Sequence, residues 1–127
     1  MFGNTKAFSG FSVNDLEKAR AFYQDQLGLE TEALGEHMFT LKLAGGTSIL
    51  VYAKPNHVPA TFTILNFQVS NVEEAVDKLS AKGIKFLQYT GPIATDARGI
   101  HRAGVEGPTV AWFTDPAGNI LSVVEGK

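Results

Sequence analysis

The side chains best suited to chemistry gather in one segment of the chain, residues 90–108. Its ionisable side chains are Asp96, Arg98, His101, Arg102 and Glu106. His101, paired with Asp96 or Glu106, would be suited to general acid–base chemistry, because histidine changes its charge near neutral pH. We also expect His101 and Arg102 to face a polar or anionic ligand.

Other reactive side chains are scarce. The chain has three histidines and no cysteine, so disulfides and thiolate chemistry are excluded. His37 falls at an expected strand start and His57 in an expected linker, both far along the chain from His101. We therefore expect unpaired histidines at the surface or at a rim, and no three-histidine metal site.

The composition is that of an ordinary small globular protein. With 127 residues, of which 44% are hydrophobic and 19% charged, the chain can form one compact domain, 1–127. A net charge of −2 with scattered Lys and Arg gives no reason to expect a nucleic acid or membrane partner. The longest apolar run, 49–53, cannot span a bilayer, and no signal peptide is visible. We expect a cytoplasmic location.

The elements that would position these side chains occur twice along the chain. Residues 7–13 and 63–69 alternate as strands do, and each run leads into a helix-start signal. The two signals are capping boxes, formed by Asn14 with Glu17 and by Ser70 with Glu73. Apolar stripes at helical spacing follow each signal.

Each half then continues with a glycine, a strand and a hairpin. Gly28 and Gly83 are expected to end the two helices. The expected strands are 29–33 and 84–89, and the expected hairpins join 37–43 to 47–52 and 110–114 to 119–125. Each half is therefore a βαβββ module.

The two modules predict an α+β protein. Module one spans 7–52, module two spans 61–125, and a proline-containing linker covers 53–60. A four-stranded sheet with a helix on one face needs a cover for its other face, and the second module is the obvious candidate.

Two stretches carry a family resemblance. Residues 11–23, FSVNDLEKARAFY, followed by LGL at 27–29, resemble the opening of vicinal-oxygen-chelate proteins, and 112–119, WFTDPAGN, is similar to their closing hairpin. The chain thus resembles the glyoxalase, bleomycin-resistance and extradiol-dioxygenase proteins of that superfamily. The resemblance implies a concave mixed sheet around a cavity, in which the enzymes of the family hold a divalent metal.

The resemblance also assigns the positions of the metal ligands. In this sequence they fall on Phe8, Leu50, Ile64 and Ser122. Three of these side chains have no donor atom, and a neutral serine hydroxyl is a poor ligand for transition metals. We expect no metal and no other cofactor. A metal-dependent glyoxalase- or dioxygenase-like enzyme stays open as an alternative if the register is wrong.

Strand alternation predicts which side chains line the cavity. The predicted ligand-binding residues are Phe8, Ser48, Leu50, Tyr52, Ile64, Asn66, Gln68, His101, Arg102, Trp112 and Ser122. Residues 90–108 are expected to form a flexible lid or wall. Trp112 is suited to stacking on a planar ligand, although a core or rim position is an equal alternative. The mixed face could also be a solvated or partly collapsed surface.

These expectations favour a metal-independent small-molecule-binding protein of the bleomycin-resistance type, one that sequesters an antibiotic or another aromatic compound. The weak acidity of the chain argues against bleomycin itself. A metal-free, lyase- or isomerase-like enzyme using His101 and a structural or regulatory module stay open. Open sheet edges and the resemblance both favour a homodimer, with module pairing within or between chains undecided.

Overall fold

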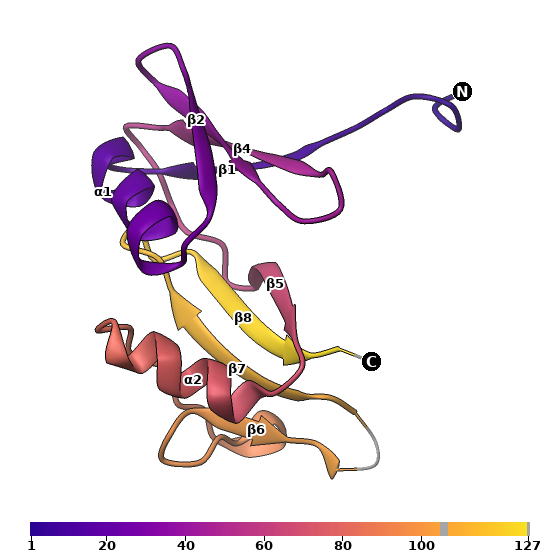
Figure 1. The fold of residues 1–127 in the computed structure, drawn as a ribbon, viewed down its shortest axis with the longest axis vertical. Helices are drawn as coiled ribbons and strands as arrows, with labels where there is room; N and C mark the ends of the chain where they lie inside the picture. Colours follow the sequence, from indigo (N-terminus) through magenta and orange to yellow (C-terminus); the bar gives the residue numbers. More distant parts are fainter. Residues whose placement is uncertain (105–106, 127) are drawn as a thin grey trace. The chain divides into compact units, whose positions relative to one another are not determined.

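The computed structural model describes residues 1–104 and 107–126 and contains two compact units, Met1–Val58 and Pro59–Lys127 (Figure 1). The boundary between the units lies inside the predicted linker, 53–60. The expectation of one domain over 1–127 stays a prediction. Within the described residues, none of the helices has the length and apolar character that crossing a membrane would require.

The first unit is a four-stranded mixed sheet with one helical segment. Its elements are β1 (Ser9–Val13), α1 (Leu16–Ala21), η1 (Phe22–Gln26), β2 (Glu30–Leu34), β3 (Met38–Lys42) and β4 (Ser48–Ala53). The strand order is β1-β4-β3-β2, with β1 parallel to β4 and the other pairs antiparallel. This is the predicted βαβββ module.

The second unit repeats the same topology. Its elements are β5 (Thr63–Val69), α2 (Val72–Ala81), η2 (Gly91–Ile93), β6 (Ile100–Arg102), β7 (Thr109–Thr114) and β8 (Ile120–Glu125). The strand order is β5-β8-β7-β6, and β5 again runs parallel to the last strand of its unit. The α+β fold class is therefore confirmed.

The second unit departs from prediction after its helix. Residues 84–89 do not form a strand. Their backbone is joined to β7 by an isolated bridge between Phe86 and Phe113 and by a 2.8 Å hydrogen bond from the Leu87 amide to the Trp112 carbonyl. The strand that pairs with β7 at the edge of the sheet is β6, which lies inside the segment expected to form a flexible lid or wall, 90–108. The described part of that segment is a turn and a strand, not a structureless loop.

The helices start one residue later than predicted. The N-caps are Asp15, whose carboxylate accepts from the Lys18 amide at 3.1 Å, and Asn71, whose side-chain oxygen accepts from the Glu74 amide at 3.0 Å. Asn14 and Ser70 are not the caps, because Asp15 and Asn71 are the residues with extended backbone that immediately precede the helical turns.

The predicted glycine stops are confirmed. Gly28 and Gly83 have φ angles of 72° and 88°, which residues with a side chain rarely adopt. The first helix also contains an unpredicted π-turn, η1, before its glycine. Phe22 and Tyr23 begin this turn, and both are buried with their rings edge to face at 5.1 Å.

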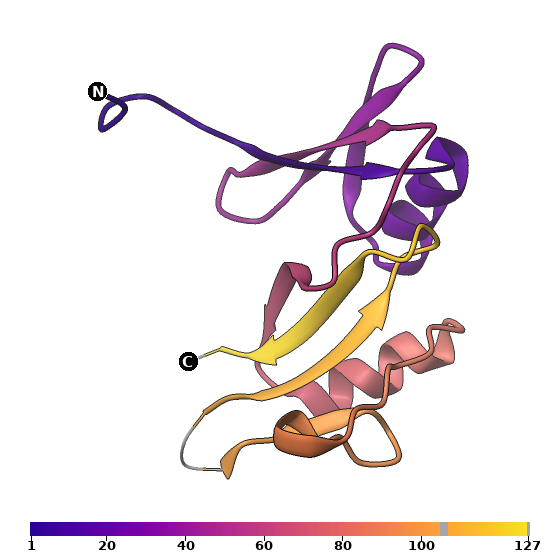
Figure 2. The same cartoon turned by 180° about the vertical axis from the view of Figure 1, so that it is seen from behind.

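Each sheet has one face packed under its helix and one open face. The register places Val13, Phe39 and Val51 on the helix side of the first sheet, and Phe113 and Leu121 on the helix side of the second. All five are buried. Figures 1 and 2 show α2 lying along one side of β7 and β8 in both views. Each sheet therefore has an apolar side that packs under its helix.

The closing-hairpin motif has a structural role. Asp115 is buried, and its Oδ1 accepts from the backbone amides of Ala117 and Asn119, both at 2.9 Å. Its Oδ2 accepts from the side-chain amide of Asn119 at 2.9 Å. Gly118 completes the turn with a φ of 85°. These contacts fix the entry of β8 and hence the register of Ser122.

The cap assignment gives a direct stability test. We expect Asp15→Ala and Asn71→Ala each to lower the free energy of unfolding by about 1 kcal/mol, since each leaves a helix N–H unpaired. Asn14→Ala and Ser70→Ala, the matched neighbours, should change it by a few tenths at most. Urea unfolding followed by circular dichroism measures all four. A larger loss from the neighbours would contradict the assigned caps.

Candidate ligand-binding face

The second unit carries a polar and aromatic surface on the side of its sheet opposite α2. The register pairs Asn66 with Ser122 and Ser122 with Trp112, so these side chains form a row across β5, β8 and β7. His101 pairs with Val110, two residues from Trp112, and shares their side. We call this surface the open face of the second unit; its described strand positions are Asn66, Gln68, His101, Val110, Trp112, Thr114, Ile120, Ser122 and Val124.

Trp112 is the centre of an aromatic cluster on this face. The indole is half-buried. The Tyr89 ring meets it edge-on with centroids 5.3 Å apart, and the His101 ring lies at 6.2 Å with a tilt of 33°. Tyr89 was absent from the predicted site, because its segment was expected to be a plain strand. Its position just before residues 90–108 is the signal that could have found it.

Asn66 and Ser122 form the main polar pair. The Ser122 hydroxyl donates to Asn66 Oδ1 at 2.6 Å. Ser122 is fully buried, whereas Asn66 is exposed. Because its oxygen accepts from Ser122, the Asn66 amide has its nitrogen left to present outward.

Asp96 shapes the segment that carries His101. Its Oδ1 accepts from the backbone amides of Arg98 at 2.8 Å and Ile100 at 3.0 Å. Its Oδ2 accepts from the guanidinium of Arg102. The Arg102 and Ile100 hydrogen bonds lower the pKa of the Asp96 carboxyl below its usual value. The segment between η2 and β6 is therefore a hydrogen-bonded wall.

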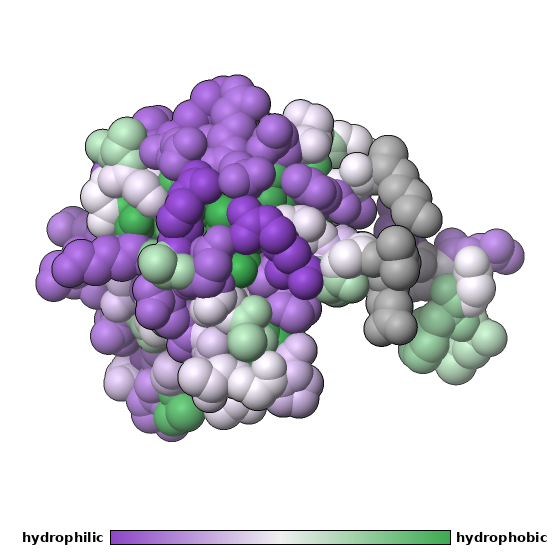
Figure 3. Space-filling view, turned by 90° about the horizontal axis from the view of Figure 1, so that it is seen from below, coloured by the Kyte–Doolittle hydropathy of each residue, from purple (hydrophilic) through white to green (hydrophobic). Residues whose placement is uncertain are grey.

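Two arginines attach this wall to α2. Arg98 and Arg102 both pair with Glu73, at 3.2 and 3.1 Å, and Arg98 also pairs with Asp77. The surface seen from this end is mainly hydrophilic (Figure 3). Arg102 pairs in register with Thr109 and lies on the helix side of the sheet, not on the open face. The prediction that Arg102 faces a ligand stays a prediction, and this register puts its side chain on the side opposite His101.

His101 and His57 both have hydrogen-bond partners, so the prediction of unpaired histidines is wrong for these two. His101 Nδ1 lies 2.9 Å from the Ala94 carbonyl, and His57 Nδ1 lies 2.6 Å from the Ser12 hydroxyl. A carbonyl can only accept, so His101 Nδ1 carries the proton, and the neutral ring keeps Nε2 as an acceptor. Asp96 is engaged with Arg102 and not with His101, and Glu106 lies outside the described residues.

The first unit has an open face of a different character. A hollow of about 540 Å³ lies between the residues before β1 and the sheet. Its lining includes Phe8, Leu34, Ser48 and Leu50, and Phe8 is 73% exposed. Tyr52 pairs with Ser12 on the same side and is 38% exposed. At the hollow, Phe8, Leu34 and Leu50 make this face chiefly apolar.

The positions that the resemblance assigns to a metal do not fit one. Phe8 and Leu50 line the apolar hollow of the first unit. Ile64 sits at a register irregularity between Thr63 and Leu65, so alternation does not assign its side, and Ser122 donates its hydroxyl to Asn66. Within the described ranges, no group of three or more His, Cys, Asp or Glu is placed to hold a metal. Metal independence itself stays a prediction.

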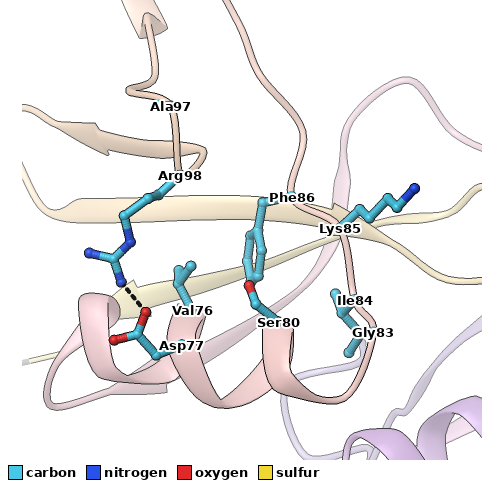
Figure 4. Close-up of a pocket in the computed structure, with 9 residues that line it drawn as sticks. All are labelled: Val76, Asp77, Ser80, Gly83, Ile84, Lys85, Phe86, Ala97 and Arg98. Atoms are coloured by element: carbon cyan, nitrogen blue, oxygen red, sulfur yellow. Dashed lines mark hydrogen bonds and ion pairs between the residues drawn. The ribbon is translucent and has the colours of Figure 1, made fainter.

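A further pocket lies on the helix side of the second unit (Figure 4). It has a volume of about 420 Å³, with Val76, Ile84 and Phe86 among its lining residues. The Asp77–Arg98 pair lies at one end, while the Lys85 side chain points away from the others (Figure 4). The sequence did not predict this pocket. It is on the opposite side of the sheet from Trp112.

Two βαβββ units, each with a helix-covered sheet, define a class of small α+β proteins. Residues 8–123 match the family model of the Glyoxalase/Bleomycin resistance protein/Dioxygenase superfamily. The chain belongs to this superfamily. A comparison with curated proteins gave no match.

Solved structures share the fold over nearly the whole chain. FosX, the fosfomycin resistance protein of Listeria monocytogenes, is 19% identical with a TM-score of 0.72, covering 98% of this chain and 94% of that chain. TnmS3, an antibiotic binding protein from Streptomyces sp. CB03234, is 22% identical with a TM-score of 0.68 and 98% coverage of both chains. Lactoylglutathione lyase from Agrobacterium tumefaciens is 23% identical with a TM-score of 0.69, covering 98% and 96%. At these identities the likeness shows the fold alone.

The lowered pKa of Asp96 predicts a pH-dependent contribution to stability. Its folded pKa lies below the unfolded value of about 3.9, so the contribution is present above that value and is lost as pH falls through the folded pKa. Asp96→Asn keeps the Oδ1 acceptor but removes the charge. We expect the variant to be less stable than the parent at pH 7 and the difference to shrink below about pH 4. Urea unfolding at several pH values measures this; a constant difference would contradict it.

Proposed function

We propose that this protein is a metal-independent small-molecule-binding protein that sequesters a planar or aromatic compound. The observation that carries the proposal is the open face of the second unit, where Trp112 lies between two other rings and the Asn66–Ser122 pair. Binding sites for small molecules combine apolar and aromatic area with a few oriented polar groups. This face offers both.

Two further findings support binding without a metal. Phe8 and Leu50 supply no donor atom, and the Ser122 hydroxyl is engaged with Asn66. Among the solved structures, TnmS3 is described as an antibiotic binding protein. FosX and lactoylglutathione lyase share the same fold, so the fold by itself does not choose between binding and catalysis.

Metal content tests the first half of the proposal. We expect the purified protein to contain no stoichiometric transition metal and its melting temperature to be unchanged by EDTA, since the described residues place no group of three His, Cys, Asp or Glu to hold an ion. Elemental analysis and thermal melting with and without chelator measure this. One tightly held metal per chain would end the metal-independent interpretation.

A ligand screen tests the second half. We expect at least one planar aromatic antibiotic or related compound to raise the melting temperature, because a ligand that binds only the native state stabilises it. Trp112→Ala should abolish that rise, whereas Phe2→Ala, which removes an exposed aromatic near the N-terminus, should not. Equal shifts in both variants would place the ligand elsewhere.

A second candidate function, a metal-free enzyme, is favoured by one contact. The Ala94 carbonyl fixes the His101 tautomer and leaves Nε2 as a proton acceptor on the open face. Under this function His101→Gln would abolish turnover of a confirmed substrate while retaining affinity within about threefold, as expected when only transition-state interactions are lost. The leading proposal instead predicts that bound compounds are recovered unchanged, which chromatography of the released ligand decides.

We also propose a homodimer in the cytoplasm. The two sheets end in strands β1, β2, β5 and β6, whose outer edges have no strand partner among the described residues. Open edges favour pairing with another chain. The absence of cysteine is compatible with a reducing compartment. Light scattering coupled to size-exclusion chromatography determines the mass in solution.

A further inference from the structure

The open face of the second unit carries no fixed formal charge. Among its described strand positions there is no Asp, Glu, Lys or Arg. The charged residues of the same strands lie on the other side: Arg102 pairs with Glu73, and the Glu125 carboxylate accepts from the Val72 amide at the start of α2. A cation seated on the described strand positions of the open face would therefore meet no carboxylate from them.

The Asn66–Ser122 pair of this face leaves a hydrogen-bond donor for a ligand. The Ser122 hydroxyl has Asn66 Oδ1 as its acceptor, and this part-buried contact joins a fully buried serine to an exposed asparagine. The contact fixes which way the amide lies and turns the Asn66 nitrogen toward the open side. Ser122 is thus a positioning residue, and Asn66 is the group that meets a ligand.

The spacing of these groups sets the size of the ligand. Asn66 on β5 and Trp112 on β7 are separated by one strand, β8, which corresponds to about 10 Å at the usual strand spacing. Tyr89 and His101 flank the indole on the far side of this row. A flat compound of two or three fused rings spans the distance from the indole to the amide.

We infer that the ligand is a planar aromatic compound whose polar substituent is a carbonyl or carboxylate oxygen, received by the Asn66 amide, and that ammonium compounds are discriminated against. This inference rests on the proposed function and names its ligand class. The discrimination follows from the chemistry of the face. An Asn66 amide covered by a ligand that offers no acceptor is unfavourable, and so is a cation that is removed from water without a counter-charge.

The experiment uses three compounds that differ only in one substituent. They are 9-anthracenecarboxylate, 9-anthracenecarboxamide and 9-anthracenemethylammonium, titrated against the full chain at pH 7. Trp112 is the one tryptophan of the sequence, so quenching of its fluorescence reports binding at this face. We expect the carboxylate and the carboxamide to bind at least about tenfold tighter than the ammonium compound, because each offers an acceptor to the Asn66 amide and the ammonium group does not.

An isosteric variant inverts the chemistry. Asn66→Asp keeps the acceptor for Ser122 but replaces the outward N–H with a carboxylate oxygen, so the order of affinities should reverse in favour of the ammonium compound. Ser122→Ala releases the amide and should reduce the preference without reversing it. Asn56→Asp, an exposed position in the first unit, adds the same charge elsewhere and should leave the order unchanged.

The outcomes separate this inference from the proposed function. If all three compounds quench the fluorescence and the ammonium compound binds as tightly as the carboxylate, the inferred ligand class is wrong. The proposed binding of aromatic compounds would still stand. An unchanged order in Asn66→Asp, with binding retained, would overturn the role of Asn66. Absence of both quenching and thermal stabilisation by every aromatic compound tested would overturn the proposed function and the inference with it.

Discussion

The structure depends on one constraint: each four-stranded sheet has a single helix to cover it. Side chains along a strand alternate between the two sides of the sheet. Those on the helix side must be apolar to pack under the helix, whereas those on the other side need not be. In the second unit Phe113 and Leu121 meet α2, while Trp112 and Ser122, their neighbours along the chain, face away. The open face of this unit can therefore carry polar and aromatic side chains, while its helix side stays apolar.

The turns and ion pairs keep that division fixed. The Asp115 carboxylate accepts hydrogen bonds from the backbone and side-chain amides of Asn119. These bonds close the last hairpin and so hold Ser122 in register. Asp96 holds the turn before β6, and its ion pair with Arg102 keeps that arginine on the helix side. In both places a carboxylate, that of Asp115 or of Asp96, accepts hydrogen bonds from nearby backbone amides. The family's most recognisable motif here therefore serves the fold, whereas the positions linked to metal chemistry carry different side chains.

Much of the fold could be predicted from the sequence, because its signals are local. Gly28 and Gly83 mark helix ends through a backbone conformation that few other residues adopt. The helix starts were displaced by one residue, since Asn14 and Asp15 are both good caps and only the backbone geometry selects between them. The short strand β6 was missed because three residues carry too little periodic pattern to read.

The site was harder to predict, because its contacts join distant segments. Asn66 and Ser122 were both assigned to the inner surface, but their hydrogen bond spans 56 positions and depends on a parallel register. Arg102 was expected in a loop that faces a ligand, whereas the structure places it in strand β6, whose register puts its side chain on the helix side. Tyr89 approaches Trp112 only because residues 84–89 leave the sheet after one bridge.

The central claim is that the open face of the second unit is where a ligand binds. The most direct measurement is a nuclear magnetic resonance titration of the labelled protein with 9-anthracenecarboxylate. The account predicts that the Trp112 indole N–H and the Asn66 side-chain amide shift together, with little change at Asp77 and Arg98 on the helix side. Shifts concentrated around Asp77, Ser80 and Arg98, with Trp112 and Asn66 unmoved, would contradict it.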